Sequence, residues 1–397
     1  MKSLVLYGFP FAADIIVSLV LFVGRHALAS LGHDEATVGS IVLFYGIGYV
    51  IAGLGMARLV KPQLARMQML GALAGIVAIC VAMANSHRLL VIQALYALFP
   101  FAVSMFFNSF QIFMLGMSND DARPLSVTAG HFTFAWSIGY GLGPFFSSLL
   151  KATLPWTQSY YLAGIIAGVM GILLLRFRQP NRRISIPLLA AAADVPAGTV
   201  GQPRHPPVLI VPAWIGLLAG WTVWTAVLIY WPIQATHMGL PAQARGLVEA
   251  VSAVSQGIGA LALTRSPRWL HRPGWWLAFG ILGTAGLLVL SSAIHPLLFA
   301  LAALLYGLYT GSMFSALVYH AMVDESKAVQ RVAVNETLVG VCLLLGSPLA
   351  RLLHRDGTAY NNAYLALSAL LLCGIVVQAL LAAGIRARDY RAASPAL

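Results

Sequence analysis

Charged side chains are scarce in this sequence. Of its 397 residues, 24 are Lys or Arg and 12 are Asp or Glu, which together make 9% of the chain. Soluble domains carry roughly a quarter charged residues, whereas 59% of the residues in this chain are hydrophobic. The deficit excludes a soluble globular protein and predicts a protein that crosses the membrane several times.

Cysteine clusters and nucleotide-binding loops are also lacking. The three cysteines, Cys80, Cys342 and Cys373, fall inside separate apolar stretches with no Cys-x-x-Cys spacing, which excludes a disulfide framework and offers no metal site. No phosphate-binding loop of the Gly-x-x-x-x-Gly-Lys-Ser/Thr type is present. We therefore expect no metal, no other cofactor and no use of ATP.

The net charge of +12 does not indicate a nucleic-acid partner. Nucleic acid requires basic residues clustered on one face of a folded domain, but here they occupy short gaps between long apolar runs. Anionic membrane lipid is the expected counter-charge.

Apolar runs long enough to span a bilayer recur along the chain. A spanning helix takes ~20 mostly apolar residues. The first run exceeds the apolar core of a signal peptide and contains Asp14, so we expect it to remain as a membrane helix. The twelve predicted spans are 4–24, 37–57, 67–84, 89–117, 125–150, 159–177, 208–231, 243–264, 274–294, 297–323, 332–350 and 361–384.

The positions of Lys and Arg set the expected orientation, because positively charged loops stay in the cytoplasm. With twelve spans and a cytoplasmic N-terminus, eighteen of the 24 basic residues fall on the cytoplasmic side. We expect both termini in the cytoplasm and a bacterial inner membrane as the location. The remaining six are Arg25, Arg88, Lys151, Arg245, Arg351 and Arg355.

A long polar stretch divides the chain into two halves. Residues 178–207 are rich in Pro, Ala and Arg and separate six spans from six. They predict a six-helix bundle at 1–177, a cytoplasmic linker at 178–207, and a second bundle with a short cytoplasmic tail at 208–397.

The halves share landmarks at one offset. Asp121 precedes a span that contains Gly143, and 203 residues later Asp324 precedes a span that contains Gly346. Because each half has an even number of spans, the repeats are parallel and can rock about a central site. We expect an all-α integral membrane protein with twelve transmembrane helices in two parallel-repeat six-helix bundles.

Ionisable side chains well inside the spans are few. They are Asp14, His131, Glu249, His320 and Glu336. Each is a functional hypothesis, because burial in hydrocarbon is costly unless the group faces protein or water. Asp14 lies about ten residues, or ~15 Å, from either end of its predicted helix, too deep to reach the surface. We predict that Asp14 or His131 carries a coupling proton or ion, since desolvation favours a neutral carboxyl group.

Uncharged polar and aromatic residues follow the same spans at helical spacing. They predict a polar, aromatic central cavity, although such residues also join helices or pack in cores. The third, sixth, ninth and twelfth spans lack ionisable groups and are expected to face lipid. The candidate cavity residues are Tyr7, Phe11, Ser18, Tyr45, Tyr49, Ser104, Asn108, Gln111, Trp136, Trp221, Trp224, Ser252, Gln256, Tyr306, Thr310 and Asn335.

Two short patterns resemble motifs of the major facilitator superfamily. After the second span, Gly53, Arg58 and Lys61 match Gly-x-x-x-Asp-(Arg/Lys)-x-Gly-(Arg/Lys)-(Arg/Lys), with the acid and the second Gly missing. In the fifth span, Gly139-Tyr-Gly-Leu-Gly143-Pro144 matches the start of the antiporter motif Gly-x-x-x-Gly-Pro-x-x-Gly-Gly, with serines replacing the final glycines. Small residues allow close helix approach, and a proline bends the helix.

The resemblance implies a secondary transporter, and the antiporter motif favours efflux. Proton-linked exporters of this family usually carry an arginine in the fourth span, which is absent here, so Asp14 or His131 would have to serve. The resemblance does not identify a subfamily. The candidate gating residues are Arg58, Lys61, Gly139, Gly143, Pro144, Glu249, Arg331 and Glu336.

Taken together, these features predict a secondary active transporter that moves a small organic solute by alternating access, with proton-coupled efflux favoured. Proton-coupled uptake of a sugar-like or zwitterionic solute is the alternative. A lipid-acting membrane enzyme would need a histidine with an acid about one turn away, which His320 and Asp324 match only weakly. A receptor without transport activity is a third class. We expect a monomer whose partners are the solute, membrane lipid and a proton or other coupling ion.

Overall fold

The computed structural model shows a helical protein. The structure describes residues 2–30, 35–120, 124–151, 155–178, 208–238, 247–293, 295–353 and 360–392, in which α-helices and two short 3-10 turns are the regular elements. The predicted linker, apart from its first residue, lies outside the described residues, as do Asp121, Arg245 and Arg355.

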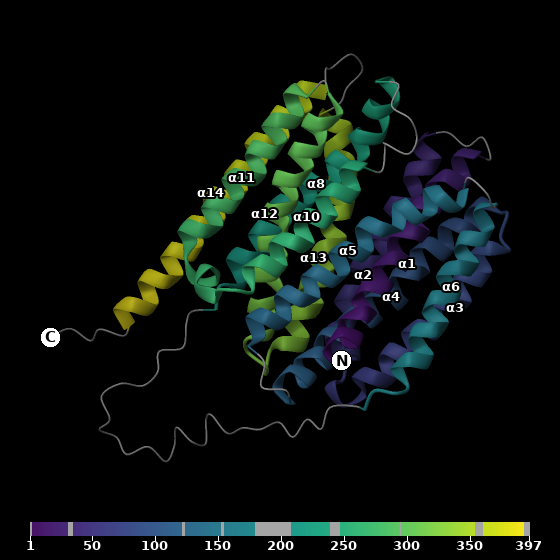
Figure 1. Ribbon diagram of the computed structural model, residues 1–397, viewed down its shortest axis with the longest axis horizontal. Helices are drawn as coiled ribbons and strands as arrows, with labels where there is room; N and C mark the ends of the chain where they lie inside the picture. Colours follow the sequence, from purple (N-terminus) through teal and green to yellow (C-terminus); the bar gives the residue numbers. More distant parts are fainter. Residues whose placement is uncertain are drawn as a thin grey trace.

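The first six helices form one bundle, coloured purple to teal in Figure 1. Within it α1 packs against α2, α5 and α6, while α3 lies against α4 and α6. Its core holds large buried rings such as Tyr96, Phe106 and Phe110. The helices are α1 (Lys2–Ser30), α2 (Glu35–Leu59), α3 (Ala65–Ala84, after the 3-10 turn Pro62–Leu64), α4 (Leu89–Asp120), α5 (Leu125–Lys151) and α6 (Trp156–Leu174).

The remaining six helices form a second bundle around another apolar core. Here α8 packs against α12, α13 and α14, and α11 lies between α12 and α14. Trp231, Tyr306 and Phe299 are fully buried within this core. The helices are α8 (Ile210–His237), α10 (Leu247–Leu263), α11 (Pro273–Ser292, after the 3-10 turn Pro267–His271), α12 (Pro296–Met322), α13 (Ala328–Leu353) and α14 (Tyr360–Ala392).

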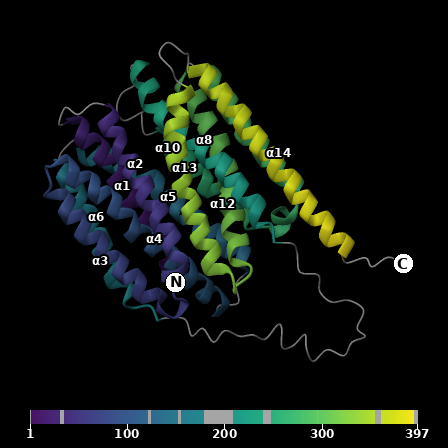
Figure 2. The same ribbon diagram turned by 180° about the vertical axis from the view of Figure 1, so that it is seen from behind.

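Each predicted span coincides with one of these helices, which confirms the twelve-helix, two-bundle fold. Ten of the described helices are long and apolar enough to cross a membrane by length and composition. The other two are α5, which is rich in Gly, Ser and Thr, and α10, of which 17 residues are described. Figure 2 shows α3 and α6 on the outer side of one bundle and α14 on the outer side of the other.

The bundles meet chiefly along two seams, formed by the helix pairs α2 with α13 and α5 with α10, and α5 also contacts α12 while α4 contacts α13. Small residues bring the backbones together at both seams. A Cβ at Gly53 would lie 2.8 Å from the Thr337 amide nitrogen of α13, and one at Gly257 would lie 3.2 Å from the Phe134 carbonyl oxygen of α5. Such close approach is how membrane helices gain contact area without a hydrophobic driving force between them.

The antiporter-like motif of α5 faces α1 within the first bundle. A Cβ at Gly139 would overlap the backbone carbonyl oxygen of Phe11, and one at Gly143 would overlap the Ser18 hydroxyl. Pro144 lies inside α5, and the Ser147 hydroxyl donates to the Gly143 carbonyl at 2.8 Å. In this structure the motif therefore sets how closely α1 approaches α5.

Replacing Gly139 by Ala should destabilise the protein by about 1–3 kcal/mol, because a backbone atom of α1 cannot move aside as a flexible side chain can. Thermal unfolding in detergent micelles measures the change. Gly168→Ala in α6 is the matched control, since nothing lies within 4 Å of a Cβ there. Equal melting temperatures for the two variants would contradict the close packing of α1 on α5.

Candidate functional site

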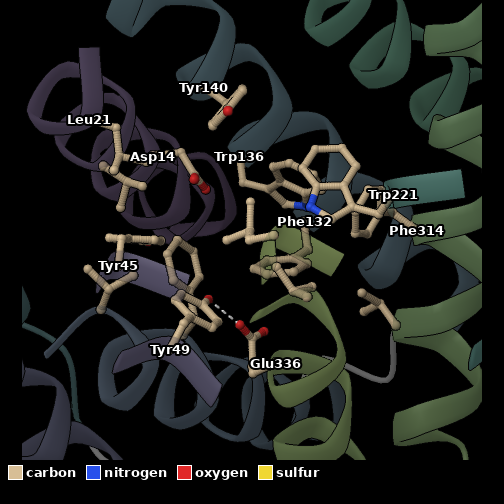
Figure 3. A pocket seen from close by; sticks show the side chains of 16 residues that line it. Asp14, Leu21, Tyr45, Tyr49, Phe132, Trp136, Tyr140, Trp221, Phe314 and Glu336 are labelled. Atoms are coloured by element: carbon tan, nitrogen blue, oxygen red, sulfur yellow. Dashed lines mark hydrogen bonds between the residues drawn. The ribbon is translucent and has the colours of Figure 1, made fainter. Parts of the chain in front are cut away.

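A cavity lies between the two bundles, bounded by helices from both (Figure 3). The cavity has a volume of about 120 Å³. The lining residues come from α1, α2, α4 and α5 on one side and α8, α12 and α13 on the other. They are Asp14, Val17, Leu21, Tyr45, Tyr49, Val103, Phe107, Phe132, Trp136, Tyr140, Trp221, Phe314, Val318, Glu336, Val339 and Leu343.

Asp14 lies near the middle of α1, twelve residues after its start at Lys2 and sixteen before its end at Ser30. Its side chain is 8% exposed and reaches into the cavity in Figure 3. The Ser18 hydroxyl donates to the Asp14 backbone carbonyl at 2.7 Å and leaves the carboxyl group unengaged. Among the described residues no side chain donates a hydrogen bond to this carboxyl group, so its hydrogen-bonding capacity is open to water, a proton or a ligand.

Glu336 of α13 faces the cavity from the opposite bundle and connects the two. Its carboxylate accepts hydrogen bonds from the Tyr49 hydroxyl of α2 at 2.5 Å and from Gln111 Nε2 of α4 at 3.0 Å. Next to it, Asn335 accepts from Trp214 Nε1 at 2.7 Å, which ties α13 to α8. Glu336 also acts electrostatically on Asp14. We call the contacts of Tyr49 and Gln111 with Glu336 the Glu336 bridge.

Aromatic rings cover much of the cavity wall. Phe314 packs edge-on against Trp136 and Trp221, with centroids 4.8 and 5.1 Å apart, and so joins α5, α8 and α12. Tyr45 lies 5.6 Å from Tyr49. The Trp221 indole N–H is buried and has no hydrogen-bond partner among the described residues, so it can donate to an acceptor that enters the cavity. The site thus combines two carboxyl groups with a broad aromatic surface.

Comparison with known proteins identifies the family. The model of the Major Facilitator Superfamily matches residues 4–334. The chain belongs to the Major Facilitator Superfamily. Members of this superfamily are transporters rather than enzymes, so the protein is an integral membrane transporter that carries a small solute.

A solved structure of this superfamily has the same fold. The crystal structure of the human organic anion transporter MFSD10 (TETRAN) matches with a TM-score of 0.67 and 16% sequence identity, covering 94% of this chain and 98% of that chain. No curated protein matches the sequence.

Six of the residues predicted for the site line the cavity. They are Asp14, Tyr45, Tyr49, Trp136, Trp221 and Glu336. His131, predicted as an alternative proton carrier, does not line it. Its ring packs against Tyr7 with centroids 5.3 Å apart. The two predicted coupling residues therefore lie in different surroundings.

Other predicted cavity residues do not line this cavity, and several of them use polar atoms in contacts within or between helices. Asn108 donates to the Ser104 carbonyl one turn earlier at 2.8 Å, and Gln256 of α10 donates to Ser137 of α5 at 2.7 Å across the bundle seam. Helical spacing identifies the polar face of a helix but does not show what that face meets. The predicted residues that do not line the cavity are Tyr7, Phe11, Ser18, Ser104, Asn108, Gln111, Trp224, Ser252, Gln256, Tyr306, Thr310 and Asn335.

Two predicted cavity aromatics are core residues of the second bundle. Trp224 of α8 stacks on Tyr306 of α12 with ring centroids 4.7 Å apart. The Tyr306 hydroxyl donates to the Gly220 carbonyl at 2.6 Å. Both rings therefore make their contacts inside the second bundle, and neither lines the cavity.

The basic gating candidates lie toward the end of the molecule at which α1 begins. Arg58 and Lys61 are exposed, and no described carboxylate forms an ion pair with either. Arg331 pairs with Asp324 at 3.3 Å in the turn between α12 and α13. The Ser326 hydroxyl, with help from Arg331 and Lys327, lowers the pKa of Asp324, which keeps this pair charged at neutral pH.

Glu249, the acidic gating candidate of α10, lies in the first turn of that helix. Glu249 is 9% exposed, and Arg25 of α1 acts on it electrostatically. A charge of the first bundle thus acts on a carboxyl group of the second bundle. Its role as a gate remains a prediction.

Sequence reasoning missed most of the apolar lining. Tyr140 follows Trp136 by four residues, and Val339 and Leu343 follow Glu336 by three and seven. These are helical spacings, so each polar candidate already indicated its apolar neighbours on the same face. Phe314 follows the predicted cavity residue Thr310 by four residues, so the same spacing indicated it, although Thr310 itself does not line the cavity.

The Glu336 bridge should couple the two bundles energetically. In a double-mutant cycle, Gln111→Ala and Glu336→Ala should show an interaction energy of about 0.5–3 kcal/mol, because each removes the same contact. Unfolding by denaturant in detergent measures it. Gln93→Ala is the matched control, since Gln93 is also on α4 but donates to Ser40 within its own bundle. The changes in unfolding free energy caused by Gln93→Ala and Glu336→Ala should add without an interaction energy. An interaction energy with Glu336→Ala that is equal for Gln93→Ala and Gln111→Ala would argue against the bridge.

Proposed function

We propose that this transporter exports a small organic solute in exchange for protons, with Asp14 as the coupling residue. The observation that carries the proposal is the Asp14 carboxyl group. It lies mid-depth in α1, faces the cavity between the bundles, and has no hydrogen-bond donor among the described residues. A membrane-buried carboxyl group with these properties favours proton exchange with the cavity.

The proposed mechanism is rocking of the two bundles about the cavity. Lining residues from both bundles make the cavity depend on the bundles' relative position, as alternating access about a midplane site requires. Proton and solute then occupy the site in alternation, because each is stabilised by the same carboxyl group. A ligand can shift the bundles only to the extent that it binds one state more tightly than the other.

The proposed direction is outward, with both termini in the cytoplasm of a bacterial cell and the protein acting as a monomer. The antiporter-like motif at Gly139, Gly143 and Pro144 supports export, since it is typical of exchangers in this superfamily. The distribution of Lys and Arg supports the orientation. Proton-coupled uptake makes the opposite prediction for the direction of coupled flux.

Asp14→Asn should abolish solute flux driven by a pH gradient, because an amide cannot exchange a proton. The assay uses oriented proteoliposomes, a pH gradient imposed in either direction, and a panel of radiolabelled aromatic solutes of different charge. We expect gradient-driven flux to fall to the level of protein-free vesicles, while solute exchange without a gradient persists.

The matched control is Glu325→Gln, which neutralises an exposed acid in the turn between α12 and α13. It should transport as the parent does. Full gradient-driven activity in Asp14→Asn would refute the role of Asp14. Solute movement in the same direction as the protons, rather than in the opposite direction, would establish proton-coupled uptake instead of export.

A further inference from the structure

The cavity carries two acidic side chains and no basic one. Asp14 and Glu336 supply the carboxyl groups among its 16 lining residues, and none of these residues is Lys, Arg or His. Taking a carboxylate out of water is costly unless a positive charge or a proton neutralises it. The cavity therefore favours any occupant that brings positive charge.

No cation of the protein supplies that charge to Asp14 within the described residues. The nearest basic residue on the same helix, Arg25, is eleven positions away, a rise of ~16 Å. Its Nε donates to the Leu21 carbonyl at 3.3 Å. The charge of Arg25 acts on Glu249, Tyr140 and Tyr96. None of the described basic residues therefore neutralises Asp14, which leaves a proton or a bound cation for that role.

The Glu336 carboxylate accepts hydrogen bonds but has no positively charged partner among the described residues. Its donors, Tyr49 and Gln111, are both uncharged. The other carboxyl group of the cavity, Asp14, has the same sign of charge when ionised, and Glu336 acts on it electrostatically. Two carboxyl groups from opposite bundles thus face one space and repel each other when both are ionised.

The walls around these groups suit a cation with an apolar body. Tyr45, Trp136, Tyr140, Trp221 and Phe314 line the space beside the carboxyl groups. Aromatic faces attract cations, and they disfavour anions because their faces carry partial negative charge. Charge and wall chemistry point to the same class of ligand.

We propose that the substrate is an organic cation, an amine or quaternary ammonium group joined to an aromatic body, held between Asp14 and Glu336. The proposal rests on the transport function proposed above and adds the substrate class. It departs from the name of the structural neighbour, an organic anion transporter, whose 16% identity shows a common fold alone. The substrate cation and protons then compete for the same two carboxyl groups.

Three matched probes test the charge requirement. Benzyl(2-hydroxyethyl)dimethylammonium carries a fixed positive charge, and 3,3-dimethyl-4-phenylbutan-1-ol is its uncharged carbon isostere. The corresponding acid, 3,3-dimethyl-4-phenylbutanoate, is the anion. Binding to the purified full chain is measured by isothermal titration calorimetry at pH 7.5. We expect the cation to bind about tenfold or more tightly than either other probe, a difference of ~1.4 kcal/mol or more.

Two variants assign the charge to the carboxyl groups. Asp14→Asn and Glu336→Gln should each weaken binding of the cation by about tenfold or more, and neither should weaken binding of the uncharged alcohol. Glu325→Gln, which removes an exposed acid outside the cavity, should leave all three affinities unchanged. A variant that weakens the alcohol as much as the cation has lost the cavity rather than a charge, and this result would overturn the proposal.

The fixed charge of the ammonium probe also makes its pH dependence informative. Because only the protein titrates, the dissociation constant should fall as pH rises from 5 to 8, with ~1 to ~2 protons released per cation bound. The titratable groups that interact with Asp14 are Tyr45, Tyr49, Tyr140 and Glu336. Those that interact with Glu336 are Tyr45, Tyr49 and Asp14, and the uncharged Gln111 amide donates to it. Tyrosine ordinarily titrates near pH ~10, so the carboxyl groups account for the released protons, and binding independent of pH would contradict the competition.

The outcomes separate this proposal from the transport function. If the alcohol or the anion drives proton-coupled flux that Asp14→Asn abolishes, transport stands and the cation assignment is wrong. If the cation binds with the expected charge and variant dependence but moves no protons in proteoliposomes, the binding site stands and proton-coupled export is wrong. No measurable binding of the cation overturns the assignment.

Discussion

A carboxyl group in the interior of a membrane has to be neutralised or solvated by something, and this requirement explains the centre of the molecule. Asp14 and Glu336 face one cavity from opposite bundles. Neither could remain there if the bundles were separate, because each would then face hydrocarbon. The cavity and the chemistry of the site therefore both depend on the contact between the bundles.

The contact between the bundles has two different parts. Along the α2/α13 and α5/α10 seams, glycines allow backbone approach that a single added Cβ would disturb at Gly53, Gly257 and Gly340. Packing of this kind is insensitive to protonation. The Glu336 bridge is different, because its strength depends on the charge of one carboxyl group. The contacts that do not depend on protonation are therefore made by the glycines, and the contact that does depend on it is made by Glu336.

The sequence predicted the helices well and the site only in part, for a physical reason. A run of apolar residues indicates a membrane helix without reference to any other segment, so all twelve spans could be located. Asp14 could be identified in the same way, because its depth follows from its own helix. The partners of Glu336 lie 287 and 225 residues away in sequence, and no local pattern connects them. Trp224 and Tyr306 show the reverse case, since their spacing suggested a cavity but the rings stack on each other within one bundle.

Two departures from the superfamily motifs gain meaning from this arrangement. The acid expected after the second span is absent, and α4 has no arginine among its residues 89–120. In their place, α2 and α4 each contribute an uncharged donor, Tyr49 and Gln111, to one acid in the opposite bundle. If a substrate cation binds Glu336, it competes with those donors for the same oxygen atoms. Occupancy of the site and closure of the bundles are then linked at a single residue, and their coupling needs no longer pathway through the protein.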